Sequence, residues 1–232
     1  MIPLRDENPT WGTPWATYAL IALNIAAWLA LQGLGTHPAL QASVVQYGFT
    51  PGDVLHGEGS WITVITSMFM HGGWFHILGN LWFLWIFGDN VEDAMGSARF
   101  VVFYLLCGMA AAAAQAISDP SSAIPMVGAS GAIGGVMGAY ALLYPQARVH
   151  MLIFLGFLVT TAAVPAVLML GYWILVQVLG GVLAPSGGGG VAFWAHVGGF
   201  AAGLVLVVLF RQPQRLSRHL SQPRRRSARH RW

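Results

Sequence analysis

Long apolar blocks alternate with short polar segments along most of the chain. Predominantly apolar stretches lie near residues 15–34, 74–91, 99–117, 130–145, 165–181 and 191–210. Each is close to the roughly 20 residues that a helix needs to cross a bilayer. The pattern therefore predicts an all-α polytopic membrane domain of six helices over residues 15–210. A short segment, 1–14, precedes this domain, and a basic tail, 211–232, follows it.

Three segments between the blocks depart from this pattern. The loop from Gly35 to Gly73 is long for a structureless link, and its apolar run from residue 61 to residue 70 predicts packing against the membrane surface. Residues 149–162 end in β-branched side chains, so we expect a strand-like or interfacial segment there, with the fifth helix starting near Pro165. The run Gly187–Gly190 predicts a flexible linker.

Composition and charge support a membrane protein and predict its orientation. Of the 232 residues, 56% are hydrophobic and 8% are charged, whereas soluble domains are about 25% charged. All eleven basic residues are arginines: Arg5, Arg99, Arg148 and eight between Arg211 and Arg231. Six crossings would bring all eleven to one side, which the positive-inside rule assigns to the cytoplasm. Both termini are therefore predicted to be cytoplasmic.

The basic tail raises the question of a nucleic-acid partner. A basic segment directly after a final span is typical of an anchor to anionic lipid. We therefore expect contact with the lipid bilayer and no nucleic-acid binding. The exclusive use of arginine indicates a GC-rich bacterial genome, from which we expect a bacterial cytoplasmic membrane.

The first candidate for chemistry is Ser130, in the motif Gly128-Ala129-Ser130-Gly131 at the start of the predicted fourth helix. Polar groups at membrane depth are costly, so they mark function more often than polar groups in soluble cores. Glycines beside a serine leave room for a substrate backbone, and free N–H groups at a helix N-terminus can stabilise an oxyanion. Small residues also pack membrane helices closely. The motif alone leaves packing and catalysis open.

The second candidate is His196, in the first two turns of the predicted sixth helix. Gly199 and Gly203 share its face, and on the fourth helix Ser130 is followed by glycines at spacings of four. If these small faces meet, Ser130 and His196 lie at similar depth, and the imidazole can accept the hydroxyl proton. A structural histidine is the alternative. The matching depth favours a pair of nucleophile and general base.

The third candidate is the pair His76 and Asn80, four residues apart on one face of the predicted second helix. Both side chains can donate hydrogen bonds to the negative oxygen that develops during acyl transfer. Polar side chains also hold membrane helices together, which is the alternative interpretation.

The acidic residues narrow the possible mechanisms. None of the eight lies mid-span near Ser130, so a serine–histidine dyad is expected and a triad is not. The chain has no His-Glu-x-x-His zinc motif, and Asp89 lacks a paired aspartate in another span. His71 and His76 lack a third converging ligand. We therefore expect no metal and no cofactor.

These motifs resemble the rhomboid family of intramembrane serine proteases, and the resemblance covers residues 61–203. The stretch from His71 to Asn80 contains an element similar to the family's His-x-x-x-Asn. Residues 128–131 resemble its nucleophile motif, and residues 195–203 resemble its Ala-His-x-x-Gly-x-x-x-Gly helix.

The resemblance implies a rhomboid-like bundle of six helices whose short fourth helix places the serine below the outer surface. Ser130 and His196 would be the catalytic dyad, and His76, Asn80 and the backbone N–H of Ser130 would form the oxyanion hole. Substrates would be single-span membrane proteins, cut near the outer membrane boundary. Residues expected to pack around the site are Gly128, Gly131, Gly199, Gly203 and His71.

Two positions depart from the pattern of some family members. Ile62 follows Trp61 where an arginine can stand, and Gly134 stands where a tyrosine can stack on the catalytic histidine. Orientation of the imidazole must then rely on other contacts. The alternative function is a catalytically silent relative that binds membrane clients. A transporter is not supported, because the spans carry no charged group near their middle and show no paired broken helices.

Overall fold

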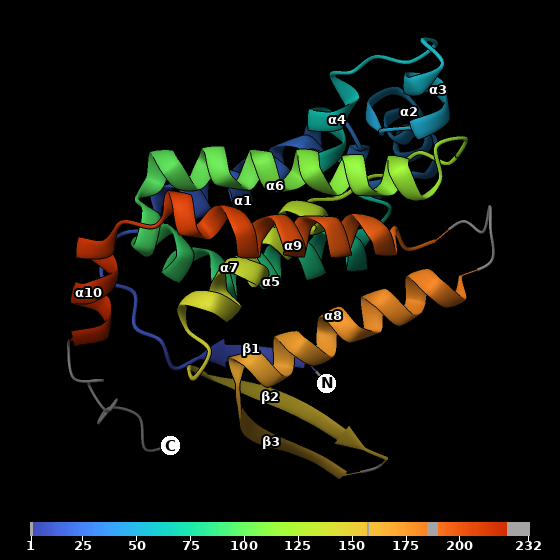
Figure 1. The fold of residues 1–232 in the computed structure, drawn as a ribbon. Helices are drawn as coiled ribbons and strands as arrows, with labels where there is room; N and C mark the ends of the chain where they lie inside the picture. The colour runs from blue at the N-terminus through green and yellow to red at the C-terminus, as the bar shows by residue number, and fades with distance from the viewer. Residues whose placement is uncertain (1, 157, 185–189, 222–232) are drawn as a thin grey trace.

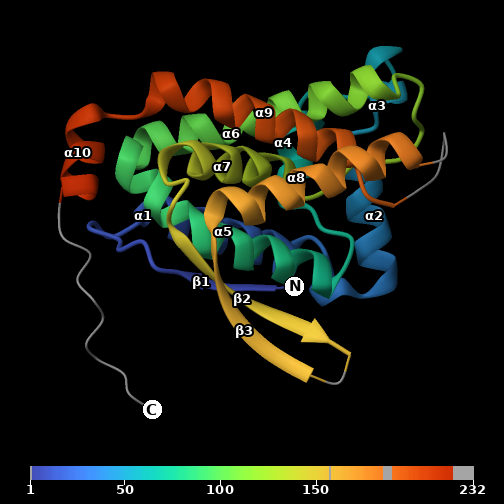
Figure 2. The ribbon, with the colours of Figure 1, turned by 60° about the horizontal axis from the view of Figure 1, so that its bottom comes forward.

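A bundle of long helices forms most of the computed structural model, which describes residues 2–156, 158–184 and 190–221 (Figures 1 and 2). Its main helices are α1 (Trp15–Ala30), α5 (Trp74–Met95), α6 (Ser97–Ser118), α7 (Ser130–Leu143), α8 (Ala166–Leu183) and α9 (Phe193–Phe210). Their ends differ from the expected spans by at most four residues.

Several of these helices suit a bilayer. Among the described residues, α6, α8 and α9 are long and apolar enough to cross a membrane. The helices α1 and α7 are apolar but shorter, with 16 and 14 residues. Helix α5 has 22 residues, but Asp89, Glu92 and Asp93 make its second half more polar. The chain is therefore an integral membrane protein with several spans.

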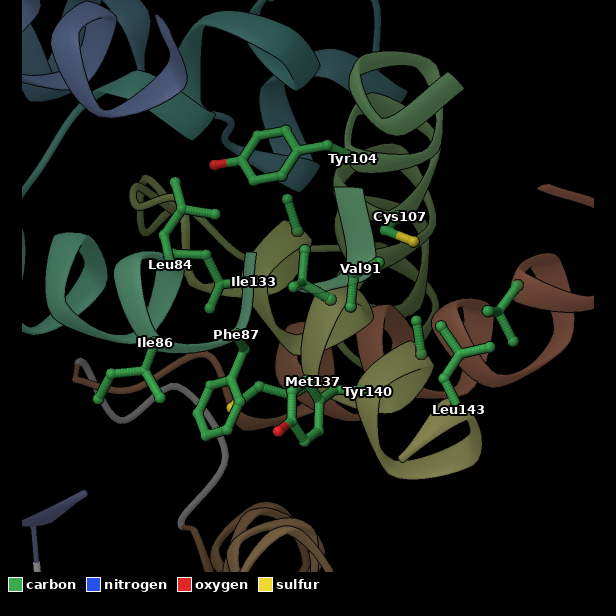
Figure 3. Close-up of a cluster of buried hydrophobic side chains, with 14 of the residues drawn as sticks. Leu84, Ile86, Phe87, Val91, Tyr104, Cys107, Ile133, Met137, Tyr140 and Leu143 are labelled. Atoms are coloured by element: carbon green, nitrogen blue, oxygen red, sulfur yellow. The ribbon is translucent and has the colours of Figure 1, made fainter. Parts of the chain in front are cut away.

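Helix α7 lies at the centre of the bundle. All residues from Gly131 to Tyr140 are buried. Apolar side chains of α5, α6 and α7 meet in the core, where Phe87 packs against Tyr140 with ring centroids 5.0 Å apart (Figure 3). A helix of 14 residues is about 21 Å long, whereas the hydrocarbon core is about 30 Å thick. The start of α7 can therefore lie well below one membrane surface.

Helices α7 and α9 contact each other through glycines. A Cβ atom on Gly199 would lie 1.9 Å from the carbonyl oxygen of Gly131, and one on Gly203 would lie 2.0 Å from that of Gly135. No larger residue fits at either position without moving a helix. The two small faces expected from the sequence therefore meet, and this contact sets the relative height of the two helices.

A small antiparallel sheet makes the fold more than a helical bundle. Its strands are β1 (Ile2–Asp6), β2 (Arg148–Leu155) and β3 (Leu158–Pro165), in the order β1-β2-β3. The segment expected to be strand-like is thus a hairpin, beside α8 in Figure 1. The expectation of an all-α chain needs correction, because Ile2–Asp6 pairs with β2. Such a short strand depends on its partner more than on its own sequence.

The long loop after α1 contains regular structure. It holds the helices α2 (His37–Tyr47), α3 (Pro51–Leu55) and α4 (Thr63–Thr66), together with the 3₁₀ turns η1 (Gly33–Gly35) and η2 (Ser67–Phe69). Trp61 and Ile62 are 65% and 62% exposed, as suits contact with lipid. At the other end, α10 (Pro213–Ser221) begins the basic tail. Most of the glycine linker (187–189) and residues 222–232 lie outside the described residues.

Carboxylates of α5 fasten the start of the chain. Glu92 accepts hydrogen bonds from the N–H groups of Ala16 and Thr17 at 3.0 and 2.8 Å, which caps α1. Asp93 accepts from two N–H groups of the preceding segment. In β1, Asp6 accepts a hydrogen bond from the hydroxyl of Tyr140, on α7. The sheet is therefore tied to the centre of the bundle.

We predict that Gly199→Ala strongly destabilises the fold. Its methyl group would overlap the Gly131 carbonyl oxygen, so the helices must separate, at a cost of about 3 kcal/mol. The melting temperature in detergent measures this loss. Gly171→Ala on α8 is the matched control, because nothing lies within 4 Å of its added Cβ. Equal melting temperatures for the two variants would contradict the close packing.

We also predict that stability depends on the ionisation of Asp6. Burial raises the pKa of this carboxyl from 3.8 to about 7, although the Tyr140 hydrogen bond acts in the opposite direction. Between these values the folded state binds more protons than the unfolded state. The stabilisation is therefore complete below the ordinary carboxyl pKa and is lost as the pH rises through about 7.

The measurement is the melting temperature in detergent between about pH 5.5 and about pH 8. The melting temperature of the wild type should fall over this range, because the free energy of unfolding falls by about 1 kcal/mol after allowance for solvent screening. Asp6→Asn keeps an acceptor for the Tyr140 hydroxyl and cannot ionise, so its curve should be flatter. Parallel curves would refute the prediction.

Candidate active site

Ser130 and His196 form a hydrogen bond between α7 and α9. The Oγ of Ser130 lies 2.8 Å from Nε2 of His196. Ser130 is the first residue of α7, and His196 lies in the first turn of α9. The glycine contact between these helices holds the two residues at the same height. The geometry suits an O–H group that donates to an unprotonated imidazole nitrogen.

His76 and Asn80 line the same cavity from the first two turns of α5. Nδ1 of His76 lies 3.1 Å from the N–H of Gly72 and accepts its hydrogen bond, so the proton of the neutral ring is on Nε2. Nδ2 of Asn80 is buried without a partner among the described residues. Two donors are therefore available beside the serine.

Gly128 brings the imidazole of His76 close to the loop before Ser130. Its φ of +123° is one that L side chains rarely adopt, and a Cβ there would lie 2.6 Å from Nε2 of His76. The same Cβ would lie 3.5 Å from Oγ of Ser130. The N–H of Gly128 donates to the carbonyl oxygen of Ser67 at 2.9 Å. Gly131 also needs to be small, because its Cβ would lie 2.5 Å from that of Ala111 on α6.

His71 is fully buried behind the cavity and packs edge-on against His76, with ring centroids 5.2 Å apart. Its backbone N–H donates to Oε1 of Gln32 at 2.8 Å, and Nε2 of Gln32 donates to its carbonyl oxygen at 2.7 Å. This pair of bonds ties the loop to the end of α1. Gln32 is not among the site residues expected from the sequence.

Helix α8 supplies two further side chains that are not among those expected from the sequence. Oε1 of Gln177 lies 2.7 Å from Nδ1 of His196, and the ring centroid of Trp173 lies 5.7 Å from that of His196. Gln177 is a single amide in the otherwise apolar stretch Ala166–Leu183. A polar group so placed in a span is itself a functional signal.

The cavity has a volume of about 430 Å³ and contains Ser130, His196, His76 and Asn80 in mostly apolar walls. The described residues include no cluster of three or more histidine, cysteine, aspartate or glutamate side chains that could hold a metal ion. The arrangement of a hydroxyl, an imidazole base and two nearby donors suits acyl transfer.

Comparisons with known proteins agree on one family. A family model described as "Rhomboid domain" matches residues 58–213, more than half of the chain. The chain is similar to "Rhomboid protease GluP" of Bacillus subtilis, with 32% identity over 72% of this chain and 31% of the relative. It is 28% identical to "Rhomboid-like protein 11, chloroplastic" of Arabidopsis thaliana, over 78% of this chain and 64% of the relative.

Another relative is "Putative rhomboid protease YdcA" of Bacillus subtilis, which is 31% identical over 53% of this chain and 60% of the relative. The chain spans between about a third and two thirds of the length of these relatives. The segment matched by the family model includes both Ser130 and His196.

Proposed function

The chain belongs to the rhomboid family, and from that premise we propose that it is an intramembrane serine endopeptidase. The observation that carries the proposal is the distance of 2.8 Å between Oγ of Ser130 and Nε2 of His196. A general base must lie about 2.6–3.2 Å from the group whose proton it takes. Ser130 is the nucleophile and His196 the general base of this reaction.

The dyad works in two stages. In the first, His196 Nε2 takes the hydroxyl proton of Ser130 while Oγ forms a bond to the scissile carbonyl carbon. The tetrahedral intermediate then releases the amine, which receives that proton from the imidazolium, and an acyl-enzyme remains. In the second stage His196 deprotonates a water, whose oxygen bonds to the ester carbon. The imidazolium then returns the proton to Oγ of Ser130 as the C–Oγ bond breaks, which releases the carboxylic acid product.

The oxyanion hole comprises Nε2–H of His76, Nδ2–H of Asn80 and the backbone N–H of Ser130. The first N–H groups of a helix have no intrahelical acceptor, so that of Ser130 is available to substrate. The hydrogen bond from Gly72 to Nδ1 of His76 supports the donor role of its Nε2. All three donors can then face the carbonyl oxygen when it becomes negative.

We further propose that residues 15–210 cross the membrane six times with both termini in the cytoplasm. The ends that carry arginine support this orientation. The guanidinium of Arg99 donates to the carbonyl oxygen of Phe210 at 3.5 Å. The backbone N–H of Glu7 donates to the carbonyl oxygen of Arg148 at 2.8 Å. The starts of α6 and β2 lie with α10 at one end of the bundle in Figure 1. The positive-inside rule assigns that end to the cytoplasm.

The proposed substrates are single-span membrane proteins that are cut near the outer membrane boundary. The basic segment 211–232 contacts anionic lipid in this proposal, and the reaction needs no cofactor. Relatives named as chloroplastic and mitochondrial occur beside bacterial ones. The choice of the bacterial cytoplasmic membrane therefore rests on the arginine usage of the chain.

We predict that Ser130→Ala and His196→Ala abolish cleavage of a single-span reporter in proteoliposomes. Each variant removes one partner of the proton transfer but should retain a melting temperature near that of the wild type. A fluorophosphonate probe should label the wild type and not Ser130→Ala. Ser118→Ala is the control, because Ser118 is the last residue of α6 and does not line the cavity. This variant should be labelled like the wild type.

Full activity of either dyad variant would refute the proposed mechanism. A wild-type protein that binds the reporter but neither cleaves it nor reacts with the probe would instead be the silent client-binding relative.

We predict that Asn80→Ala lowers kcat about 100-fold and changes KM little, because the donor acts on charge that develops only in the transition state. Cleavage kinetics of the same reporter measure kcat and KM separately. Asn24→Ala is the matched control, since Asn24 is a buried asparagine on α1, away from the cavity. A loss confined to KM in Asn80→Ala would assign this residue to substrate binding instead.

A further inference from the structure

Helix α8 turns one face toward the rest of the bundle. Its buried residues are Ala166, Met169, Leu170 and Gln177, so the amide continues an apolar stripe. Gln177 is only 7% exposed. An amide in such surroundings is costly unless its oxygen and its nitrogen both find partners. The hydrogen-bond partners of the Gln177 amide therefore indicate its role.

The two ends of the amide have different neighbours. Nε2 of Gln177 donates to the backbone carbonyl oxygen of Trp173 at 3.4 Å, one turn earlier in the same helix. A carbonyl oxygen can only accept, so this contact turns the amide oxygen outward, where it lies 2.7 Å from Nδ1 of His196. The reversed amide would bring two acceptors together at the Trp173 carbonyl.

This orientation determines which imidazole nitrogen carries the proton. An amide oxygen accepts a hydrogen bond, so Nδ1 of His196 must be the N–H donor. The lone pair is then on Nε2, which lies 2.8 Å from Oγ of Ser130. The backbone carbonyl of Trp173 thus acts on the serine through the amide and the imidazole.

We propose that Gln177 is a positioning residue, whose side-chain oxygen holds His196 in the tautomer and orientation that let Nε2 accept the proton of Ser130. It occupies the place at Nδ1 that the acid of a serine protease triad would take. The inference rests on the proposed serine endopeptidase function. It assigns no contact between Gln177 and the substrate.

Helix α8 also supplies a ring that packs beside His196, where Gly134 of α7 has no side chain to offer. A Cβ on Gly134 would lie 3.8 Å from the ring of Trp173 and 3.1 Å from the carbonyl oxygen of His196. The Trp173 ring therefore packs beside the imidazole where another side chain could have come from α7. Trp173 and Gln177 are one turn apart, so a single helix face both packs against the imidazole and bonds to it.

Among the described residues, the polar side chains near the imidazole of His196 come from three other helices. Ser130 comes from α7, Gln177 from α8 and the imidazole of His76 from α5. From α6, Gln115 reaches only the backbone, where Oε1 accepts the N–H of Ala195 at 3.3 Å. Gln115 is therefore a matched control: another amide that contacts the start of α9 without touching the imidazole.

The test compares kcat and KM of the wild type, Gln177→Met, Gln177→Glu and Gln115→Met on one reporter in proteoliposomes across about pH 5–9. Methionine has a similar length but offers no comparable acceptor, so Gln177→Met should lower kcat about 10- to 100-fold with little change in KM. Gln115→Met should stay within about twofold of the wild type.

Gln177→Glu keeps the acceptor and should retain most of the activity at high pH. Its carboxylate also favours the protonated imidazole, so the acidic limb of its kcat profile should shift upward by about one pH unit. Polar contact between α8 and α9 without a role in positioning would predict neither the shift nor the split between kcat and KM.

A wild-type kcat for Gln177→Met, or a Gln177→Glu profile that superimposes on the wild type, would overturn the inference. If Gln177→Met does not fold, the Gln177→Glu profile decides alone. Failure of the proposed function looks different, because the wild type itself would then neither cleave the reporter nor label at Ser130.

Discussion

The contact between the backbones of α7 and α9 is the constraint on which the site depends. Lipid surrounds helices as favourably as other helices do, so close packing and hydrogen bonds between helices hold a pair together in a bilayer. Glycines permit that packing here, with no room for a Cβ on Gly199 against Gly131. Ser130 precedes Gly131 and His196 lies one turn before Gly199. Any separation of the two helices therefore lengthens the hydrogen bond between the dyad side chains.

Two histidines of this site are held in opposite tautomers, each by one neighbour. The N–H of Gly72 donates to Nδ1 of His76, which leaves the ring proton on Nε2. The amide oxygen of Gln177 accepts from Nδ1 of His196, which leaves Nε2 as an acceptor for the serine. In surroundings of low dielectric such hydrogen bonds are strong, and their loss is costly. In the proposed reaction one imidazole would donate a hydrogen bond to the oxyanion and the other would accept the serine proton.

The sequence predicts the elements of this fold better than the contacts between them. Apolar blocks locate the long helices, and glycine spacing predicts that α7 meets α9. The helical period predicts the face of α8 on which Gln177 lies. It does not predict which residue Gln177 contacts, because the contact depends on how α8 packs on α9. Likewise β1 pairs with a strand that begins at Arg148, and nothing in Ile2–Asp6 specifies so distant a partner. The catalytic assignment itself leans on the family resemblance as well as on spacing.

The unpaired amide nitrogen of Asn80, on α5, connects the stability of the resting protein to its proposed chemistry. Nδ2 of Asn80 is buried without a partner among the described residues, which costs free energy in the absence of substrate. A carbonyl oxygen in the cavity relieves part of that cost, and an oxyanion relieves more, because hydrogen bonds to charged acceptors are stronger. The interaction therefore grows from ground state to transition state, which is the condition for raising kcat. A site with its donors already paired would be more stable and less able to do this.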